Sequence, residues 1–144
     1  MKNNYTIEAY KKSQLSANLT KSPHEIVRHL MDNLIACMKN INEDTDFLEN
    51  KSNQNDINIV EVSKNRANNV TKALTIIYSL QVSLDFEKTP EIAKSFFQIY
   101  EYCRQQIIKA LTQKIKSGLE KSIKVMEEIL DGWLEIGLER KNNA

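Results

Sequence analysis

The chain has 144 residues, which suits one domain that buries its own core without disulfides or metals. It holds only 3 Gly and 2 Pro, too few for the closely spaced turns of a sheet protein, so we expect an all-α fold. The formal net charge of +1 gives no overall field that would attract nucleic acid or an anionic membrane surface, and we expect neither partner. We also expect no membrane insertion, because no run of about 18 apolar residues is present.

The first 21 residues are polar, with a few apolar side chains scattered among Lys, Asn and Ser. The chain does not begin with the apolar segment of a signal peptide, which predicts a cytoplasmic protein. Too few apolar side chains are present to hold this segment firmly, so residues 1–21 are expected to form a loosely docked N-terminal arm. Tyr10 lies on this arm, outside the helical stripes described below, and is a candidate for partner contact.

The first core helix is predicted from Ser22 to Ile41, and Phe47 and Leu48 leave open an extension by another turn or two. Ser22 is a favourable N-cap, Pro23 suits the first helical position, and Glu25 completes a capping box. The apolar residues that follow recur at helical spacing, in a stripe wider than a single helix contact needs, so this helix should touch more than one neighbour. They are Ile26, Val27, Leu30, Met31, Leu34, Cys37, Met38 and Ile41.

Three further helices are predicted by the same periodicity, over residues 57–84, 90–115 and 119–138. Polar residues 51–56 form the first loop. Thr89 is expected to cap the third helix, with Pro90 at its first position. The segment 116–118, which includes Gly118, is expected to end that helix and turn the chain.

Four amphipathic segments joined by short loops predict an antiparallel up-down-up-down four-helix bundle. We expect a single domain, with residues 22–138 as the helical core and 139–144 as a frayed polar tail. Cys37 and Cys103 both fall on apolar stripes, which predicts buried thiols rather than a disulfide.

The two histidines do not form a recognisable metal site. His24 and His29 are five positions apart, about 140° around a helix, whereas a zincin motif places two His four apart on one face. His24 is expected at the surface of the first turn, and His29 in a solvated or partly packed position. The chain also lacks a Gly-rich phosphate loop and an identifiable pair of nucleophile and base. We therefore expect no metal, no cofactor and no enzymatic activity.

Several short motifs stand in the order of one known family. They are Ala9-Tyr10-Lys11-Lys12, Ser22-Pro23-His24-Glu25 with Leu30-Met31-Asp32, Leu80 with Leu84-Asp85, Phe96-x-x-Ile99-Tyr100-x-Tyr102, and Gly132-Trp133. In this order, over residues 9–136, the chain resembles the flagellar export chaperone family, FliS.

The resemblance implies a protein that binds the disordered carboxy-terminal segment of flagellin and keeps flagellin unpolymerised before secretion. That segment would become helical in apolar grooves, which is helix-in-groove recognition. Together with the wide apolar stripes, the resemblance places seven candidate partner-binding residues near the grooves: Tyr10, Ile26, Leu30, Leu34, Ile77, Leu80 and Tyr100. Components of the flagellar export apparatus, or a co-chaperone, are further candidate partners.

Two other functions stay open at this point. A helical adaptor or co-chaperone would bind a folded partner of the export apparatus through a flat apolar patch. A small helical enzyme or phosphorelay module would need a reactive His29, and the sequence shows no partner groups for it.

Overall fold

The computed structural model describes residues 22–50, 55–113 and 115–142, with side chains described as far as residue 137. The expected N-terminal arm, including Tyr10, lies outside the described residues. Within them the chain forms four helices and no strand: α2 (Pro23–Glu49), α3 (Asp56–Val82), α4 (Pro90–Thr112) and α5 (Ser117–Asn142). The prediction of an all-α four-helix bundle is confirmed.

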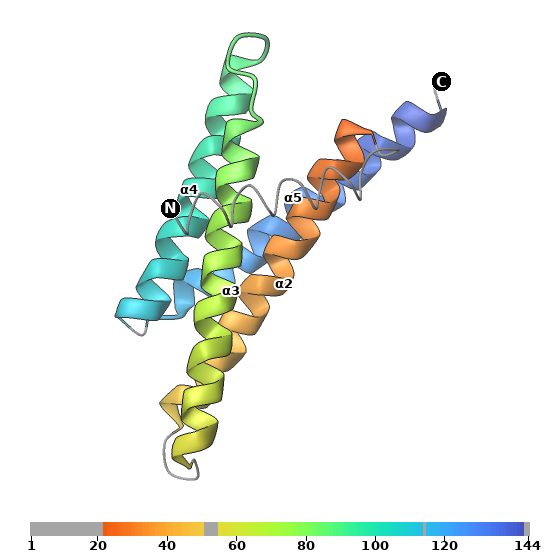
Figure 1. The fold of residues 1–144 in the computed structure, drawn as a ribbon. Helices are drawn as coiled ribbons and strands as arrows, with labels where there is room; N and C mark the ends of the chain where they lie inside the picture. Colours follow the sequence, from red (N-terminus) through yellow and green to blue (C-terminus); the bar gives the residue numbers. More distant parts are fainter. Residues whose placement is uncertain (1–21, 51–54, 114, 143–144) are drawn as a thin grey trace, which may run out of the picture.

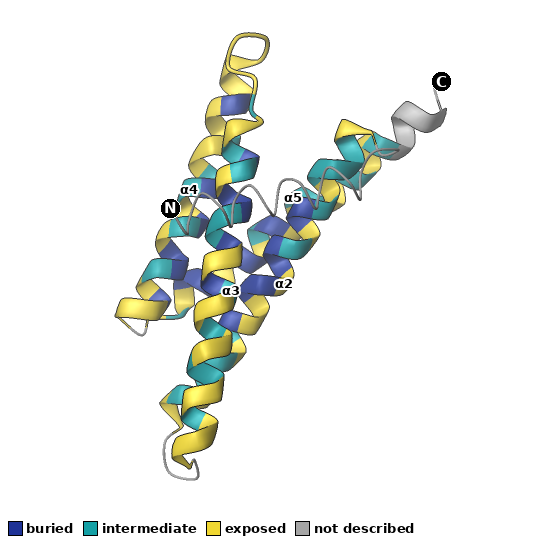
Figure 2. Cartoon of the chain, in the orientation of Figure 1, coloured by how far each residue is buried: buried dark blue, intermediate teal, exposed yellow. Residues whose placement is uncertain are grey.

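The four helices cross in the middle of the molecule and diverge at their ends (Figure 1). The hairpin of α3 and α4 extends in one direction, while the N-terminal end of α2 and the C-terminal part of α5 extend together in another. Buried residues gather where the helices cross, and the divergent ends are largely exposed (Figure 2). This divergence decides which parts of each apolar stripe are covered by a neighbouring helix.

The helix starts follow from local capping chemistry, with one exception. The Ser22 hydroxyl accepts a hydrogen bond from the Glu25 amide at 3.2 Å, as predicted, and the Asn55 side chain accepts one from the Asn58 amide at 2.8 Å. Thr89 occupies the N-cap position of α4 with Pro90 at its first position, as predicted, but the Thr89 hydroxyl makes no cap bond and instead donates to the Asp85 carbonyl at 3.2 Å.

The ends of the helices agree only in part with the sequence expectation. Helix α2 continues to Glu49, through the extension that Phe47 and Leu48 left open, and Thr45 on its inner face is buried with its hydroxyl bonded to the Ile41 carbonyl at 2.7 Å. Helix α4 ends at Thr112, and Gly118 lies in the first turn of α5 rather than in a chain reversal. Helix α5 continues to Asn142, beyond the expected end at 138.

The core is made almost wholly of aliphatic, Met and Cys side chains from all four helices. Cys37 and Cys103 are both buried free thiols, which confirms the prediction. Of three further apolar side chains on α3, Ile76 is fully buried, whereas Val60 and Val82 are exposed. The largest fully buried apolar side chains are Met31, Leu34, Met38, Ile41, Ile76, Ile77, Leu80, Ile107, Leu119 and Met126.

Candidate functional site

An apolar pocket of about 370 Å³ opens between α4 and α5. We call it the α4–α5 pocket. Phe96, Ile99 and Ile129 are half-buried, whereas Ile92 at the outer end is 58% exposed. Six residues line the pocket, four of them apolar: Glu91, Ile92, Ser95, Phe96, Ile99 and Ile129.

The pocket is a continuation of the core that the chain's own helices do not fill. On α4 the buried residues Tyr100 and Cys103 belong to an apolar stripe that continues toward the N-terminus through Phe96 and Ile92. The N-terminal end of α4 lies on the divergent hairpin, away from the C-terminal part of α5 (Figure 1). The apolar stripe therefore extends beyond the neighbours that would cover it, and its outer members face the pocket.

A second group of exposed apolar side chains lies at the tip of the α3–α4 hairpin. We call Tyr78, Val82, Phe86 and Phe97 the tip residues; Tyr78 is 51% exposed, and the other three are exposed as well. The rings of Phe86 and Phe97 meet edge to face, with centroids 6.2 Å apart. These side chains contribute no wall to the α4–α5 pocket.

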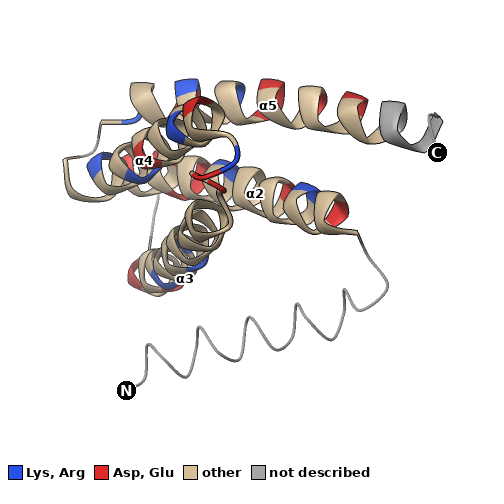
Figure 3. Cartoon of the chain, turned by 90° about the horizontal axis from the view of Figure 1, so that it is seen from above, with Lys and Arg blue, Asp and Glu red and all other residues tan. Residues whose placement is uncertain are grey.

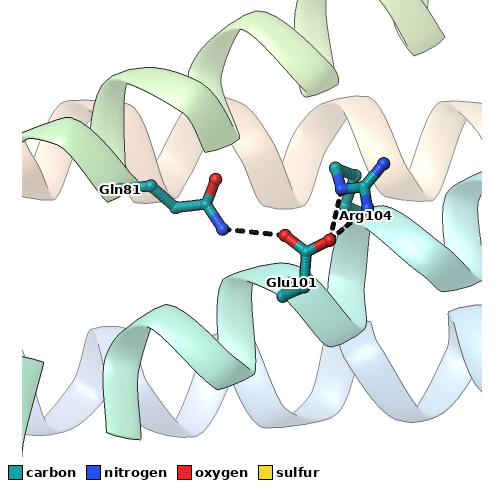
Figure 4. A network of polar contacts seen from close by, with 3 residues as sticks. All are labelled: Gln81, Glu101 and Arg104. Atoms are coloured by element: carbon teal, nitrogen blue, oxygen red, sulfur yellow. Dashed lines mark hydrogen bonds and ion pairs between the residues drawn. The ribbon is translucent and has the colours of Figure 1, made fainter. Parts of the chain in front are cut away.

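Helices α3 and α4 are joined by a small polar network (Figure 4). The Gln81 amide donates to one oxygen of Glu101 at 3.1 Å, and the Arg104 Nε donates to the other at 2.6 Å. The hydrogen bond from Arg104 is the main reason that the pKa of Glu101 lies below its usual value, with that from Gln81 second. The network holds the hairpin together, while the pocket lies on the side of α4 toward α5.

Two aromatic rings join α2 to α5 near the divergent ends of these helices. The rings of His24 and Trp133 are stacked, with centroids 4.6 Å apart and planes inclined by 3°. The prediction that His24 is a surface residue of the first turn is therefore wrong, because the ring is partly buried and hydrogen-bonded. The sequence could not reveal this contact, since the two residues are 109 positions apart.

The two thiols are not activated nucleophiles. Burial raises the pKa of the Cys103 thiol to about 11, and it raises the pKa of Cys37 as well. Both side chains are therefore protonated at neutral pH, whereas a reactive cysteine needs a substantial thiolate fraction. Burial also raises the pKa of Tyr100 well above its ordinary value of 10.0.

The structure separates the seven candidate residues of the sequence analysis into three groups. Leu30, Leu34, Ile77, Leu80 and Tyr100 are buried in the core, and Leu34 and Ile77 are completely inaccessible. Ile26 is half-buried and packs against the core cluster. Tyr10 lies outside the described residues. None of the six described candidates lines the α4–α5 pocket.

Sequence reasoning missed all six residues that line the pocket, of which the four apolar ones lie on apolar faces of the predicted helices. Ile92, Phe96 and Ile99 belong to the stripe of the third helix, and Ile129 lies on the fourth. Periodicity indicated that these residues face inward, and it could not indicate that they lie beyond the region where the helices cross. Only the width of the stripes signalled that some apolar surface would stay uncovered.

The described side chains contain no group of three or more His, Cys, Asp or Glu arranged to hold a metal ion. Among the described helices, none combines the length and apolar character needed to cross a bilayer.

The fold and the pocket define an all-α protein of the four-helix-bundle class with an open apolar cleft between two helices. Comparison with known proteins narrows this class. The family described as "Flagellar protein FliS" matches residues 5–140. The chain is 30% identical over 138 residues to the flagellar secretion chaperone FliS of Vibrio cholerae serotype O1, covering 95% of this chain and 92% of that protein.

A second relative is the flagellar secretion chaperone FliS of Salmonella typhimurium, 28% identical over 132 residues, which covers 90% of this chain and 88% of that protein. Both matches cover nearly the whole length of this chain and of the relative. The chain therefore belongs to the FliS family. The resemblance inferred from the ordered motifs is confirmed.

Proposed function

We propose that this chain is a cytoplasmic flagellar secretion chaperone that binds the disordered carboxy-terminal segment of flagellin in an apolar groove. The observation that carries the proposal is the α4–α5 pocket, an apolar cleft formed by side chains that the described helices leave uncovered. Membership of the FliS family and the names of the two relatives support it. A client segment that folds as an amphipathic helix would bury its apolar face against Phe96, Ile99 and Ile129.

The energetics of such binding are feasible for a groove larger than the pocket alone. Micromolar affinity needs about 8 kcal/mol, and ordering a disordered client costs about 2–5 kcal/mol more. Each fully buried Leu or Ile contributes roughly 1.5–3 kcal/mol, so about five to eight anchor residues are needed. The four apolar residues of the pocket supply part of this contact, and the exposed side chain of Ile136 on α5 adds to the same surface.

Binding of this kind would block polymerisation without any covalent chemistry. A client segment whose apolar side chains are held in the groove cannot offer them to another flagellin subunit. Of the candidates named from the sequence, we propose that the buried ones support the groove from beneath: Leu30, Leu34, Ile77, Leu80 and Tyr100. Ile26 and Tyr10 remain proposed contacts at its edges.

A comparison of two adjacent phenylalanines tests the proposal. Phe96 lines the pocket, whereas Phe97 points away from it and contacts Phe86. Fluorescence anisotropy with a labelled carboxy-terminal flagellin segment should show binding to the wild type, weakened about tenfold or more by Phe96→Ala and within about twofold of the wild type for Phe97→Ala. The helix content of the complex, measured by circular dichroism, should exceed the sum of the helix contents of the two separate partners.

Thermal melts of both variants would confirm that each still folds, so that a loss of affinity can be attributed to the altered groove and not to unfolding. Absence of any complex with the wild type would contradict flagellin binding. Equal losses from Phe96→Ala and Phe97→Ala would show that the pocket is not the place of contact.

The tip residues favour a second candidate function, binding of a folded partner such as an export-apparatus component or a co-chaperone. Tyr78, Val82, Phe86 and Phe97 expose aromatic and aliphatic surface at the end of the α3–α4 hairpin, and such side chains are frequent anchors of protein interfaces. If this is the main function, Phe97→Ala would weaken capture of the partner while Phe96→Ala would not. No helix would be gained on binding, since both partners are already folded.

A further inference from the structure

Gly132 occupies an open position in the middle of α5. A side chain built there would meet no atom within 4 Å among the described residues. The other two glycines of α5 differ: a β-carbon at Gly118 would overlap the side chain of Gln106, and one at Gly137 would overlap the ring of His24. Glycine is less favourable than alanine within a helix, and packing among the described residues gives no reason for it at position 132.

The position of Gly132 relates it to the α4–α5 pocket. It lies three residues after Ile129, which lines the pocket, and four residues before Ile136, which is 43% exposed. Residues at these spacings share one face of a helix, so Ile129, Gly132 and Ile136 form a stripe along α5. Because the pocket already reaches Ile129, the stripe extends it toward the C-terminus. We call the pocket and this stripe together the α4–α5 groove.

The α5 side of this groove is acidic. Between residues 125 and 139 the helix carries five carboxylates and no Lys or Arg, as the acidic positions toward its C-terminal end illustrate (Figure 3). Glu128 and Glu135 stand four residues before and three after Gly132, next to the stripe. Neither makes an ion pair with a described residue, whereas Glu127 on the α2 side pairs with Lys39 at 3.7 Å. Glu91 adds a carboxylate to the lining contributed by α4.

We propose that the α4–α5 groove selects a basic amphipathic helix. The apolar side chains of this guest helix pass close over the α5 backbone at Gly132, and its flanking Lys or Arg residues face Glu128 and Glu135. This inference rests on the proposed function, since the helix would be part of the exported client, and it adds the chemistry that distinguishes one client helix from another. The missing side chain at position 132 lets the guest approach the α5 backbone closely. The carboxylates at the edge steer association and reject acidic helices.

The close approach is tested by enlarging position 132 in the full-length protein. Gly132→Ala should raise the melting temperature by about 3 °C, because alanine favours the helix and its β-carbon meets no described residue within 4 Å. The same variant should bind the labelled carboxy-terminal flagellin segment about tenfold more weakly, and Gly132→Leu more weakly still. Ala36→Leu, at an exposed position of α2 that does not line the pocket, is the matched control and should leave binding unchanged.

The proposed pairing of Lys or Arg residues of the guest helix with the α5 carboxylates is tested by the double substitution Glu128→Gln with Glu135→Gln. Association with the same segment, followed by stopped-flow fluorescence, should slow about fivefold at low salt and lose most of its dependence on salt concentration. The control pair Glu43→Gln with Glu61→Gln removes two exposed carboxylates from α2 and α3 and should change neither quantity.

The outcomes separate the two proposals. If the wild type does not bind the segment at all, flagellin binding fails and this inference falls with it. If the wild type binds, and Gly132→Ala binds within about twofold of it, the close approach at Gly132 is overturned while the proposed function stands. An unchanged rate and salt dependence in the Glu128 and Glu135 variant would likewise overturn the assignment of a basic guest helix.

Discussion

His24 and Trp133 hold each other through two hydrogen bonds that run in opposite directions between α2 and α5. The Trp133 indole donates to the His24 carbonyl at 2.9 Å, and the His24 Nε2 lies 2.6 Å from the Trp133 carbonyl. Since a carbonyl can only accept, the His24 ring carries a proton on Nε2. The contact joins the first turn of α2 to the part of α5 that follows the α4–α5 pocket, and so helps to define one wall of the groove.

We predict that His24→Ala lowers the free energy of unfolding by about 2 kcal/mol, because it removes the ring stack and one partly buried hydrogen bond. The corresponding fall in melting temperature is about 5 °C. Differential scanning calorimetry measures both. His24→Phe keeps the stacked ring without the hydrogen bond, and should lie between the wild type and the alanine variant; equal stability of all three proteins would show that the contact contributes nothing.

Gly118→Ala should destabilise the protein by about 1–3 kcal/mol. The added β-carbon would overlap the side chain of Gln106, which is buried and has little room to move aside. Urea unfolding followed by circular dichroism measures the change. Gly132→Ala adds the same methyl group to the same helix at an open position and serves as the control, so a loss of stability in both variants would contradict the packing explanation.

The Glu101 network should make a small, pH-dependent contribution to stability. The pKa of Glu101 is lowered in the folded protein, chiefly by Arg104, so the contribution is present above the unfolded pKa of about 4.3 and is lost as the pH falls through the folded pKa. Its size is at most about 1 kcal/mol, because the pair is partly exposed to solvent, which screens the attraction. Urea unfolding of the wild type and Glu101→Gln should therefore differ at pH 7 and converge near pH 3. A difference that persists at pH 3 would rule out the ionised pair as its source.

Cys103 should resist alkylation in the folded protein. Burial raises its pKa to about 11, so little thiolate is present at pH 8, and the side chain is completely inaccessible. Mass spectrometry after iodoacetamide treatment should find this residue unmodified under native conditions and modified in urea. Because an unfolded thiol ionises first, with a pKa of about 8.5, stability should fall as the pH rises above that value. Rapid native labelling would show that the α4–α5 contact opens readily.

The sequence by itself determined the elements of this fold. Helical periodicity and scarce Gly and Pro predicted four helices, and the pairing of Ser22 with Glu25 located the start of α2. These features are local: a cap needs only its own first turn, and an apolar stripe needs only its own spacing. The burial of Cys37 and Cys103 followed from the same stripes, because a residue on the inner face near the middle of a long helix is covered by any neighbour.

Only the tertiary structure decided how far along each helix the apolar stripe is covered by neighbouring helices. Ile77 and Ile92 are both apolar members of predicted stripes, yet one is fully buried and the other is 58% exposed. The difference arises because the helices diverge from a common crossing region, and crossing geometry depends on how side chains of two helices fit together, which no single stripe encodes. The same is true of His24, whose partner lies on another helix, and of Gly118 and Gly132, which differ only in what stands opposite them.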